Sequence, residues 1–418
     1  MNTYKMSING YFTFTKKGDL YRCIFNEILL HLLITHTHLK LLLFIFICLL
    51  SWTKAAYSQQ ISIQGRMVDA DTGEALPYVN ICTEQGKGTL TNDDGEFKLT
   101  TDSGDILTIS CIGYEKLTVK ATDLAPTIRL KPYSISLREV TVRPVNAKRI
   151  LKRTIENLKQ DYQKQGKWTR KYFFRTLIEK KDGTYLAEAF IKAYSVVNIR
   201  SFMVIKGLES YDKEANKGKL NLRSLNIHRI MEVAPMTNES AFWMNAIKPL
   251  SDFSTLHKYY NIQSYLLQGE DGNEICRTDF SWKKGRTPES MKKSGIAGTA
   301  FIDIETCRLL RFDGSCDNYF IYEHGHSFPT SINFHLEYDY SQGAASVSHV
   351  SISGGNELTR YRALLFAIDK DEQQTMGMSE IGFDIVTAIK EAGYDVSLWD
   401  EYDIVKRTKE EEQAAFRP

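Results

Sequence analysis

Residues 69–81 read DADTGEALPYVNI, and the stretch could form either a chemical site or a turn. A cluster of its acids could bind a metal or move a proton; these acids are Asp69, Asp71 and Glu74. Asp71-Thr72-Gly73 is instead typical of a tight turn, and Pro77 suits the first position of a strand because it cannot donate to a ladder. Alternating apolar residues then begin a buried face. The stretch therefore predicts a loop between two strands, shaped by its acids.

Short alternating runs continue on both sides of this loop, from residue 61 to residue 131. Within each run the apolar residues share one parity, as Phe97 and Leu99 do, which is typical of strands with one buried face. Turn sequences rich in Asp, Asn and Gly separate the runs, for example Asn92-Asp93-Asp94-Gly95. About six or seven strands in so short a region predict a compact antiparallel β-sandwich.

Three blocks of this region resemble the carboxypeptidase regulatory-like domain, a transthyretin-like, Ig-like β-sandwich: GRMVDADTGEALPYVNI, GTLTNDDGEFKLT and ILTISCIGYEKLTV. The segment SLREVTV at 136–142 is similar to the link after this domain in envelope proteins of Bacteroidetes, including TonB-dependent receptors. The resemblance implies a Gram-negative cell envelope. It concerns an accessory domain, so it implies no catalytic residue.

Residues 1–58 are predicted to be a leader with a secretory signal peptide. Lys40 precedes the apolar run LLLFIFICLL at 41–50, and Ala56-Tyr57-Ser58 places small residues before a cleavage between Ser58 and Gln59. The run is shorter than the roughly 20 residues of a spanning helix. An uncleaved anchor stays open as an alternative, because a second apolar stretch lies at 28–34. It would associate the protein with a membrane.

Charge and cysteine content exclude some classes of protein. The chain has a formal net charge of +2, and removing the six basic and two acidic residues of the leader changes it to −2. Nothing in this balance favours nucleic acid, which would require a strongly basic face. Five cysteines at irregular spacings remain after the leader, and we interpret them as free thiols that form neither a disulfide framework nor a zinc site.

The rest of the chain predicts a helix and then a large sheet. The sandwich is assigned to 59–132, a linker with an amphipathic helix to 133–166, and an antiparallel β-rich module with a C-terminal helix to 167–418. Hairpin turns are expected near 181–183 and 270–272, and a helix from Ser379 is expected to end before Gly393. The charged tail at 400–416 is expected to be solvated. The predicted fold is mainly β: a sandwich followed by an α+β module with flanking helices.

This second module resembles the C-terminal module of uncharacterised Bacteroidetes proteins. Its GTAFIDIET hairpin is similar to the outer-membrane lipoprotein carrier group, whose antiparallel sheet curls around a helix to enclose an apolar cavity. The second resemblance rests on one hairpin and a strand count. It implies an architecture and no particular activity.

Motifs for catalysis, cofactors and metals are absent from the sequence. No HExxH occurs, and none of the histidines after the leader has a Glu three positions later. His324 and His326 would share a face of a strand, but without further ligands we interpret them as loop residues. His335 and Glu337 would likewise share a strand face, and we interpret them as a cross-strand polar pair. We therefore predict no metal and no cofactor; the candidate ligand contacts are Trp243, Trp282, His324 and His326.

These observations favour a non-catalytic cell-envelope protein that binds or scaffolds at the periplasmic or outer-membrane face. Its partner would be an envelope protein, a glycan or a lipid. The first alternative is a carrier of a lipid or another apolar ligand, which requires an unfilled apolar volume beneath the helix of the second module. The second alternative is a hydrolase without a recognised motif, which requires a cleft with convergent carboxylates or a histidine pair.

Overall fold

The computed structural model describes residues 4–7, 11–14, 26, 60–135, 147–163, 168–181, 183–194, 202–211, 258, 260–268, 272–283, 297–323, 326–357, 359–368, 372–373, 385–401 and 405–415. Two units emerge, residues 1–60 and residues 61–418. In the first unit, strands β1 (Tyr4–Ser7) and β2 (Tyr11–Phe14) form an antiparallel pair. Among the described residues, no helix combines the length and the apolar character that crossing a membrane requires. Ser58, Gln59 and the apolar run at 41–50 lie outside these residues, and the domain boundaries remain predictions.

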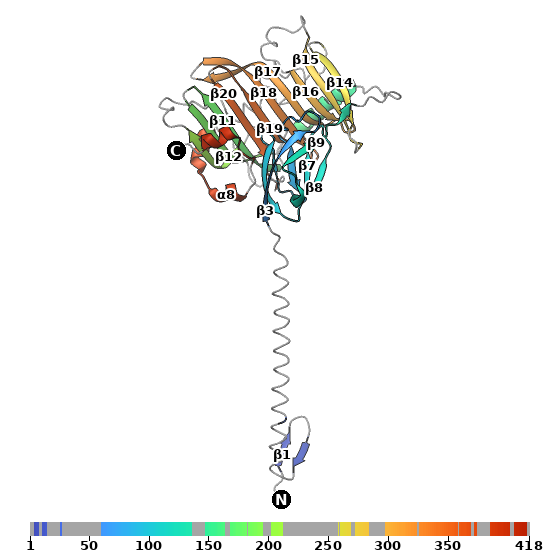
Figure 1. Cartoon of the computed structure of the whole chain (residues 1–418), viewed down its shortest axis with the longest axis vertical. Helices are drawn as coiled ribbons and strands as arrows, with labels where there is room; N and C mark the ends of the chain where they lie inside the picture. The colour runs from blue at the N-terminus through green and yellow to red at the C-terminus, as the bar shows by residue number, and fades with distance from the viewer. Residues whose placement is uncertain are drawn as a thin grey trace. The chain divides into compact units, whose positions relative to one another are not determined.

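Seven strands form the predicted sandwich at the start of the second unit (Figure 1). One sheet has the order β6-β3-β9 and the other the order β5-β4-β7-β8. Strands β3 and β9 pair in parallel, which differs from the antiparallel prediction. A 3-10 helix, η1 (Ala121–Asp123), separates β8 in one sheet from β9 in the other. The strands are β3 (Gln60–Asp69), β4 (Asn80–Thr83), β5 (Gly88–Leu90), β6 (Glu96–Asp102), β7 (Ile106–Ser110), β8 (Leu117–Lys120) and β9 (Thr127–Leu130).

The loop at 69–81 is held by the carboxylate of Asp69. This carboxylate accepts hydrogen bonds from the backbone N–H groups of Asp71 and Thr72, each at 2.8 Å, and from the Tyr114 hydroxyl at 2.9 Å. Burial acts to raise the pKa of Asp69, but these hydrogen bonds outweigh it and lower the pKa. Gly73 has a φ of 74°, which glycine adopts without steric cost. Asp69 therefore shapes the loop, as the sequence predicts.

A twelve-stranded sheet forms most of the rest of this unit (Figure 1). Its order is β10-β14-β15-β16-β17-β18-β19-β20-β11-β12-β13, and β21 pairs with β11 outside this path. The predicted hairpins β11–β12 and β14–β15 are both present. The strands are β10 (Ser134–Ile135), β11 (Trp168–Lys180), β12 (Gly183–Tyr194), β13 (Phe202–Tyr211), β14 (Tyr260–Gln268), β15 (Glu274–Trp282), β16 (Ala297–Asp303), β17 (Leu309–Glu323), β18 (His326–Asp339), β19 (Ser346–Gly355), β20 (Thr359–Ala367) and β21 (Glu372–Gln373).

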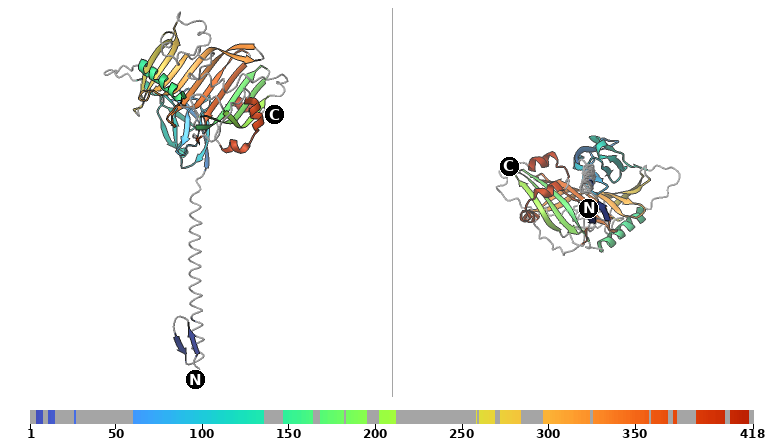
Figure 2. Two further views of the ribbon diagram at one scale, coloured as in Figure 1. Left: turned by 180° about the vertical axis from the view of Figure 1, so that it is seen from behind. Right: turned by 90° about the horizontal axis from the view of Figure 1, so that it is seen from below.

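The two faces of this sheet differ in chemistry because side chains alternate along each strand. One face is apolar, and residues such as Phe312 and Leu336 pack there with the helix α2 (Ala147–Gln163) and with Ile389 of α7 (Ile385–Ala392). The sandwich lies on the opposite side of the sheet from α2 (Figure 2). On the sandwich side, β17, β18 and β19 present charged and polar side chains at the intervening positions. One face of the sheet therefore contributes to the apolar core, and the other face forms a polar interface with the sandwich.

The C-terminal tail is packed, and the prediction of a solvated end was wrong. Val405 and Thr408 are buried, and Val405 joins Phe173, Phe190 and Phe366 in an apolar cluster. The tail contains the helix α9 (Lys409–Ala415), preceded along the chain by α8 (Val396–Glu401). Charged residues dominate the sequence of the tail, but several of their side chains lie inside the protein and pair with buried partners of the sheet.

Candidate functional site

Tyr78 connects the sandwich to the polar face of the sheet. It lies in the turn before β4 with a φ of 62°, a conformation that is rare for a residue with a side chain. Its ring centroid lies 5.1 Å from that of His335 and 4.6 Å from that of His349. The Tyr78 hydroxyl donates to the carboxylate of Asp93, and burial raises its pKa well above the usual value. The strained turn therefore places an aromatic ring on two histidines of the sheet.

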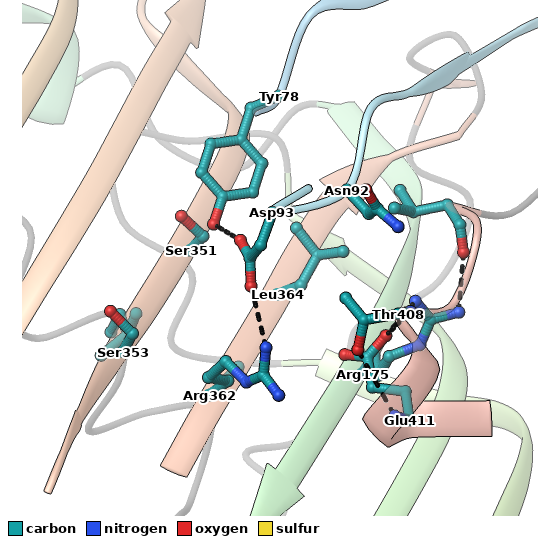
Figure 3. A pocket seen from close by; sticks show the side chains of 13 residues that line it. Tyr78, Asn92, Asp93, Arg175, Ser351, Ser353, Arg362, Leu364, Thr408 and Glu411 are labelled. Atoms are coloured by element: carbon teal, nitrogen blue, oxygen red, sulfur yellow. Dashed lines mark hydrogen bonds and ion pairs between the residues drawn. The ribbon is translucent and has the colours of Figure 1, made fainter. Parts of the chain in front are cut away.

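Further polar contacts fix the sandwich to the sheet and to the tail. Lys406 Nζ lies 2.6 Å from Glu96 Oε2, and Arg362 Nη1 lies 3.6 Å from Asp93 Oδ2. Arg311 Nη1 donates to the backbone carbonyl of Ile112 at 3.3 Å. Figure 3 shows Tyr78, Asp93 and Arg362 converging with Arg175 and Glu411 around a small polar pocket. Three parts of the chain that are distant in sequence thus share one interface.

A buried ion network attaches the tail to the sheet beside this pocket. Glu188 is 0% exposed; its Oε1 accepts from Arg175 Nε at 2.7 Å, and its Oε2 accepts from Arg407 Nη2 at 2.6 Å and from the Trp399 ring at 3.2 Å. Burial acts to raise the pKa of Glu188, but the charge of Arg175 and the contacts with Arg407 lower it to about 2. Glu411 accepts from Arg175 at 3.2 Å. The paired charges explain why these groups are tolerated inside the protein.

A cleft of about 670 Å³ separates the four-stranded sheet of the sandwich from the large sheet. The sandwich side includes Thr89, Ser110 and Tyr114, and the sheet side includes Glu337 and His349. A second cavity, of about 250 Å³, is lined by residues that include Tyr78, Asp313 and His335. Cys111 and Tyr114 line both cavities. The two histidines that contact Tyr78 are divided between the cavities: His349 lines the cleft, and His335 lines the second cavity.

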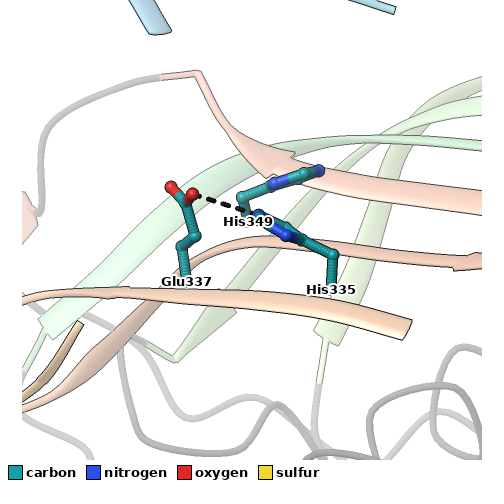
Figure 4. Close-up of side chains that lie close together, drawn as sticks. All are labelled: His335, Glu337 and His349. Carbon is teal, nitrogen blue, oxygen red and sulfur yellow. Dashed lines mark hydrogen bonds and ion pairs between the residues drawn. The ribbon is translucent and has the colours of Figure 1, made fainter. Parts of the chain in front are cut away.

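His335, Glu337 and His349 gather on this face because of strand register (Figure 4). His335 and Glu337 are two positions apart on β18, so they point to the same side. His349 is the partner of Glu337 on the neighbouring strand β19. Asp313 on β17 is the partner of His335 on the other side. Three adjacent strands therefore bring two imidazoles and two carboxylates together.

Hydrogen bonds orient His335 and its carboxylate partners. His335 Nδ1 lies 2.7 Å from Asp313 Oδ1, and Nε2 lies 3.0 Å from Glu337 Oε1. Burial acts to lower the pKa of His335, but the bonds to Asp313 and Glu337 outweigh it and raise the pKa. Arg311 Nε donates to Asp313 Oδ2 at 2.9 Å, and Asp313 has a lowered pKa because His335 and Arg311 outweigh its burial. Each group here, apart from His349, has a partner.

His349 differs from its neighbours in hydrogen bonding. Its side chain is 2% exposed, and neither ring nitrogen has a hydrogen-bond partner within the described part of the chain. Burial lowers its pKa well below the usual value, and the charges of His335 and Arg311 lower it further. The ring is therefore neutral and has at least one nitrogen lone pair without a donor among these residues. Thr89 Oγ1, which lines the same cleft, is likewise buried and without a partner there.

The side chains of the four candidate ligand contacts from the sequence fall outside the described structure. Trp282 ends β15 and pairs with Tyr260, and His326 begins β18 opposite Glu323, but their side chains are outside the described structure. Trp243 and His324 are outside it altogether. His335 and Glu337 share a strand face, as predicted, but they contact each other along β18, and their cross-strand partners are Asp313 and His349. Asp313 and His349 were not predicted as members of this group. The signal for them in the sequence is a polar residue at the covered face of each neighbouring strand.

The four cysteines among the described residues are free thiols and form no disulfide bridge there. Cys276 and Cys307 are buried free thiols, while Cys82 and Cys111 are half-buried free thiols that line the cleft. Burial raises the pKa of the Cys111 thiol to about 12, so this thiol is protonated at neutral pH.

Comparison with known proteins supports the assignment of the first domain. Residues 63–142 match the family model of the CarboxypepD_reg-like domain, which confirms the resemblance. This is a non-catalytic, Ig-like domain, and the match supplies no catalytic residue. The TonB-dependent receptor SusC of Bacteroides thetaiotaomicron is 39% identical over 61 residues, which are 14% of this chain and 6% of the receptor.

One solved structure aligns with the chain at low similarity. A DUF1329 family protein from Desulfovibrio piger aligns with 57% of this chain and 98% of its own, at 10% identity and a TM-score of 0.21. The alignment is too weak to inform fold or function.

Proposed function

We propose that the protein is a non-catalytic binding protein of the bacterial cell envelope, in which the sandwich and the sheet together form the ligand site. The observation that supports this most is the cleft of about 670 Å³ between them. Two buried polar groups in its lining, Thr89 Oγ1 and His349, have no hydrogen-bond partner among the described residues. Ligand pockets of about 300–1,000 Å³ with a few converging polar groups are typical of small-molecule sites. The match of residues 63–142 supports the envelope location.

The lining of the cleft favours a polar ligand, and a short glycan is our first candidate. Amide and hydroxyl groups line the cleft together with aromatic rings, a combination that can hydrogen-bond sugar hydroxyls and pack against sugar rings. A lipid carrier is less well supported, since the face toward α2 is filled by side chains such as Phe174, Phe312 and Leu336, each at most 1% exposed. Polar and aromatic groups that line the cleft include Asn80, Thr89, Ser110, Tyr114, Asn273, Ser348 and Phe366.

A hydrolase is the second candidate function, and one observation favours it. A histidine pair lies beside two carboxylates at the boundary of the two cavities: His349 and Glu337 line the cleft, and His335 and Asp313 line the smaller cavity. This arrangement is what the hydrolase alternative required, although at different histidines from His324 and His326.

Native mass spectrometry of the full chain, purified gently from envelopes, tests the binding function. We expect a co-purified polar ligand, and we expect Ser110→Trp to lose it because Ser110 lines the cleft from β7. Ile106→Trp is the matched control, since Ile106 is on the same strand and face but is 42% exposed and outside the cleft lining. Equal retention of the ligand by both variants would place binding elsewhere, and an apolar lipid in its place would support the carrier.

A further inference from the structure

We propose that His335, Glu337 and His349 bind one divalent transition-metal ion, with Zn²⁺ as the ion that the donor set favours. Each residue offers one ligand atom, and the three atoms lie within 4.8 Å of one another. Two imidazole nitrogens and one carboxylate oxygen are ligands that Zn²⁺ uses at about 2.0–2.2 Å. Tetrahedral geometry at those bond lengths separates ligand atoms by about 3.4 Å. Small rotations of the side chains suffice to close the site.

The backbone holds the three ligands in place independently of any ion. They come from β18 and β19, two paired strands in the interior of the sheet, where Glu337 and His349 are register partners. Sites on paired strands are more precisely positioned than sites on loops. The ring of Tyr78 covers both imidazoles from the sandwich side. The ligands are thus preorganised on a rigid sheet.

The partners of His335 match those of a metal-bound histidine. Such a histidine commonly donates its second ring N–H to a carboxylate, which fixes the tautomer and the ring orientation. His335 Nδ1 lies 2.7 Å from Asp313 Oδ1, and Asp313 is held in turn by Arg311. With the Nδ1–H donated to Asp313, metal binding would release the Nε2 proton that now faces Glu337 and use the Nε2 lone pair. The ion would replace the present contact between Nε2 and the Glu337 carboxylate.

His349 provides an independent observation that points to a ligand. Buried polar side chains nearly always have a hydrogen-bond partner, yet both ring nitrogens of this 2% exposed residue lack one among the described residues. A bound ion would supply the partner. The competing explanation, an ion network in which a protonated His335 joins Asp313 and Glu337, leaves His349 without one.

The metal site would open toward the cleft. Glu337 and His349 both line it, and three protein ligands leave a coordination position for water or a ligand group, as in catalytic zinc sites. The inference goes beyond the proposed binding function and holds whether or not a glycan binds. It would also give the hydrolase alternative its chemistry.

Metal titration of the tag-free full chain, stripped with a chelator, tests the site. We expect one equivalent of Co²⁺ to bind with visible absorption bands that Zn²⁺ then abolishes, and a Zn²⁺ dissociation constant below about 1 μM by calorimetry. His349→Phe and Glu337→Gln should each weaken binding at least 100-fold. Ser353→Ala, on the same strand and face but without a ligand atom, should bind as the native chain does.

Thermal unfolding separates a metal role from a purely structural one. Zn²⁺ should raise the melting temperature of the native chain and leave that of His349→Phe unchanged. Without metal, His349→Phe should melt at the same temperature or higher, because an apolar ring replaces an unpartnered imidazole. If this variant does not fold, Glu337→Gln gives the same comparison. The absence of one-to-one Co²⁺ uptake by the folded native chain would overturn the proposal, as would full affinity in the ligand variants.

A working metal site and a failed cleft can be told apart. Ser110 is not one of the three metal ligands, so Ser110→Trp should bind Zn²⁺ normally while losing the proposed polar ligand. Loss of Zn²⁺ binding in that variant would contradict the assignment of the ligands.

Discussion

Tyr78 shows how one residue of the loop at 69–81 determines the assembly of the protein. Its positive φ directs the ring out of the sandwich and onto His335 and His349. The sequence indicated a turn and then a strand here, and both are present. Nothing in the pattern indicated the target of the tyrosine, because periodicity reports which face of a strand is covered but not what covers it.

Substitution of Tyr78 tests this contact. Tyr78→Ala should lower the free energy of unfolding by about 2–4 kcal/mol, because a large ring leaves a packed interface. Tyr78→Phe keeps the ring and removes the hydroxyl bond to Asp93, so it should cost about 1 kcal/mol. Urea denaturation measures both. Equal losses in the two variants would show that the ring contributes nothing.

Removal of the Glu188 charge should destabilise the protein much more than removal of an exposed one. Glu188→Gln leaves Arg175 and Arg407 without their carboxylate, and breaking a buried pair costs about 3–5 kcal/mol. Glu179→Gln is the control, because Glu179 lies 3.7 Å from an Arg360 side chain that is 77% exposed. It should cost at most about 1 kcal/mol. Denaturation midpoints compare the two, and similar losses would contradict the buried network.

The same carboxylate should make stability depend on acid. The pKa of Glu188 is lowered to about 2 in the folded protein, below that of an unfolded glutamate at about 4.3. Its contribution is therefore complete above the unfolded pKa and is lost as the pH falls toward 2. Urea unfolding between about pH 5 and pH 2 should show a steeper loss for the native chain than for Glu188→Gln. Parallel curves would count against the assigned pKa.

His349 marks the limit of what the sequence could show about the site. Metal motifs are recognised by spacing along one element, and the pair His335 and Glu337 was found in this way. His349 joins them through the register of β18 with β19, which depends on the bulge between Glu337 and Tyr338. Asp313 joins them through the register of β17 with β18, where it is the partner of His335. A signal was present, since all four are polar at the mid-strand positions that alternate with apolar ones.

At the scale of elements, period-two runs and turn residues predicted most strands. Both predicted hairpins and the helix at 147–163 are present because their alternation and caps are local properties. The parallel pairing of β3 with β9 and the packed tail were missed because they depend on partners far away in sequence. The charges of the tail suggested exposure, whereas Arg407 and Glu411 pair with buried charges.

The end of α7 was predicted from one glycine, and that residue can be tested. Gly393 has a φ of 68°, and its N–H donates to the Ile389 carbonyl at 3.1 Å. Gly393→Ala should lower the free energy of unfolding by about 1 kcal/mol, because an alanine is strained in this conformation. Gly104→Ala is the control, since no positive φ and no close neighbour restrict that position. Thermal unfolding should separate the two variants, and equal melting temperatures would contradict the assigned cap.

Truncation tests whether the tail is part of the core. Removing residues 405–418 would expose the apolar cluster that contains Phe173 and Phe190, and would leave Glu188 without Arg407. We expect a lower melting temperature and rapid proteolysis of the sheet. Lys406→Ala is the control, because it removes only a partly exposed ion pair. A truncated chain as stable as this control would show that the tail is dispensable.

At the scale of the whole second unit, the fold places the sandwich on the polar face of a sheet whose other face forms the main core. The cleft and the cover over the histidine cluster both depend on that docking. The sequence predicted the sandwich and the sheet separately. Their contact depends on complementary surfaces that form only in the folded protein, so no periodicity or motif in the sequence predicts it.

Zero-length carbodiimide cross-linking of the full chain, read by mass spectrometry, tests the docking most directly. Lys406 of the tail and Glu96 of the sandwich lie 2.6 Å apart, and Lys131 with Glu115, 3.9 Å apart within the sandwich, provides the internal standard. The docked structure predicts both cross-links in native conditions and neither in urea. A native sample that yields the Lys131–Glu115 product without the Lys406–Glu96 product would contradict the docking of the sandwich against the tail and the sheet.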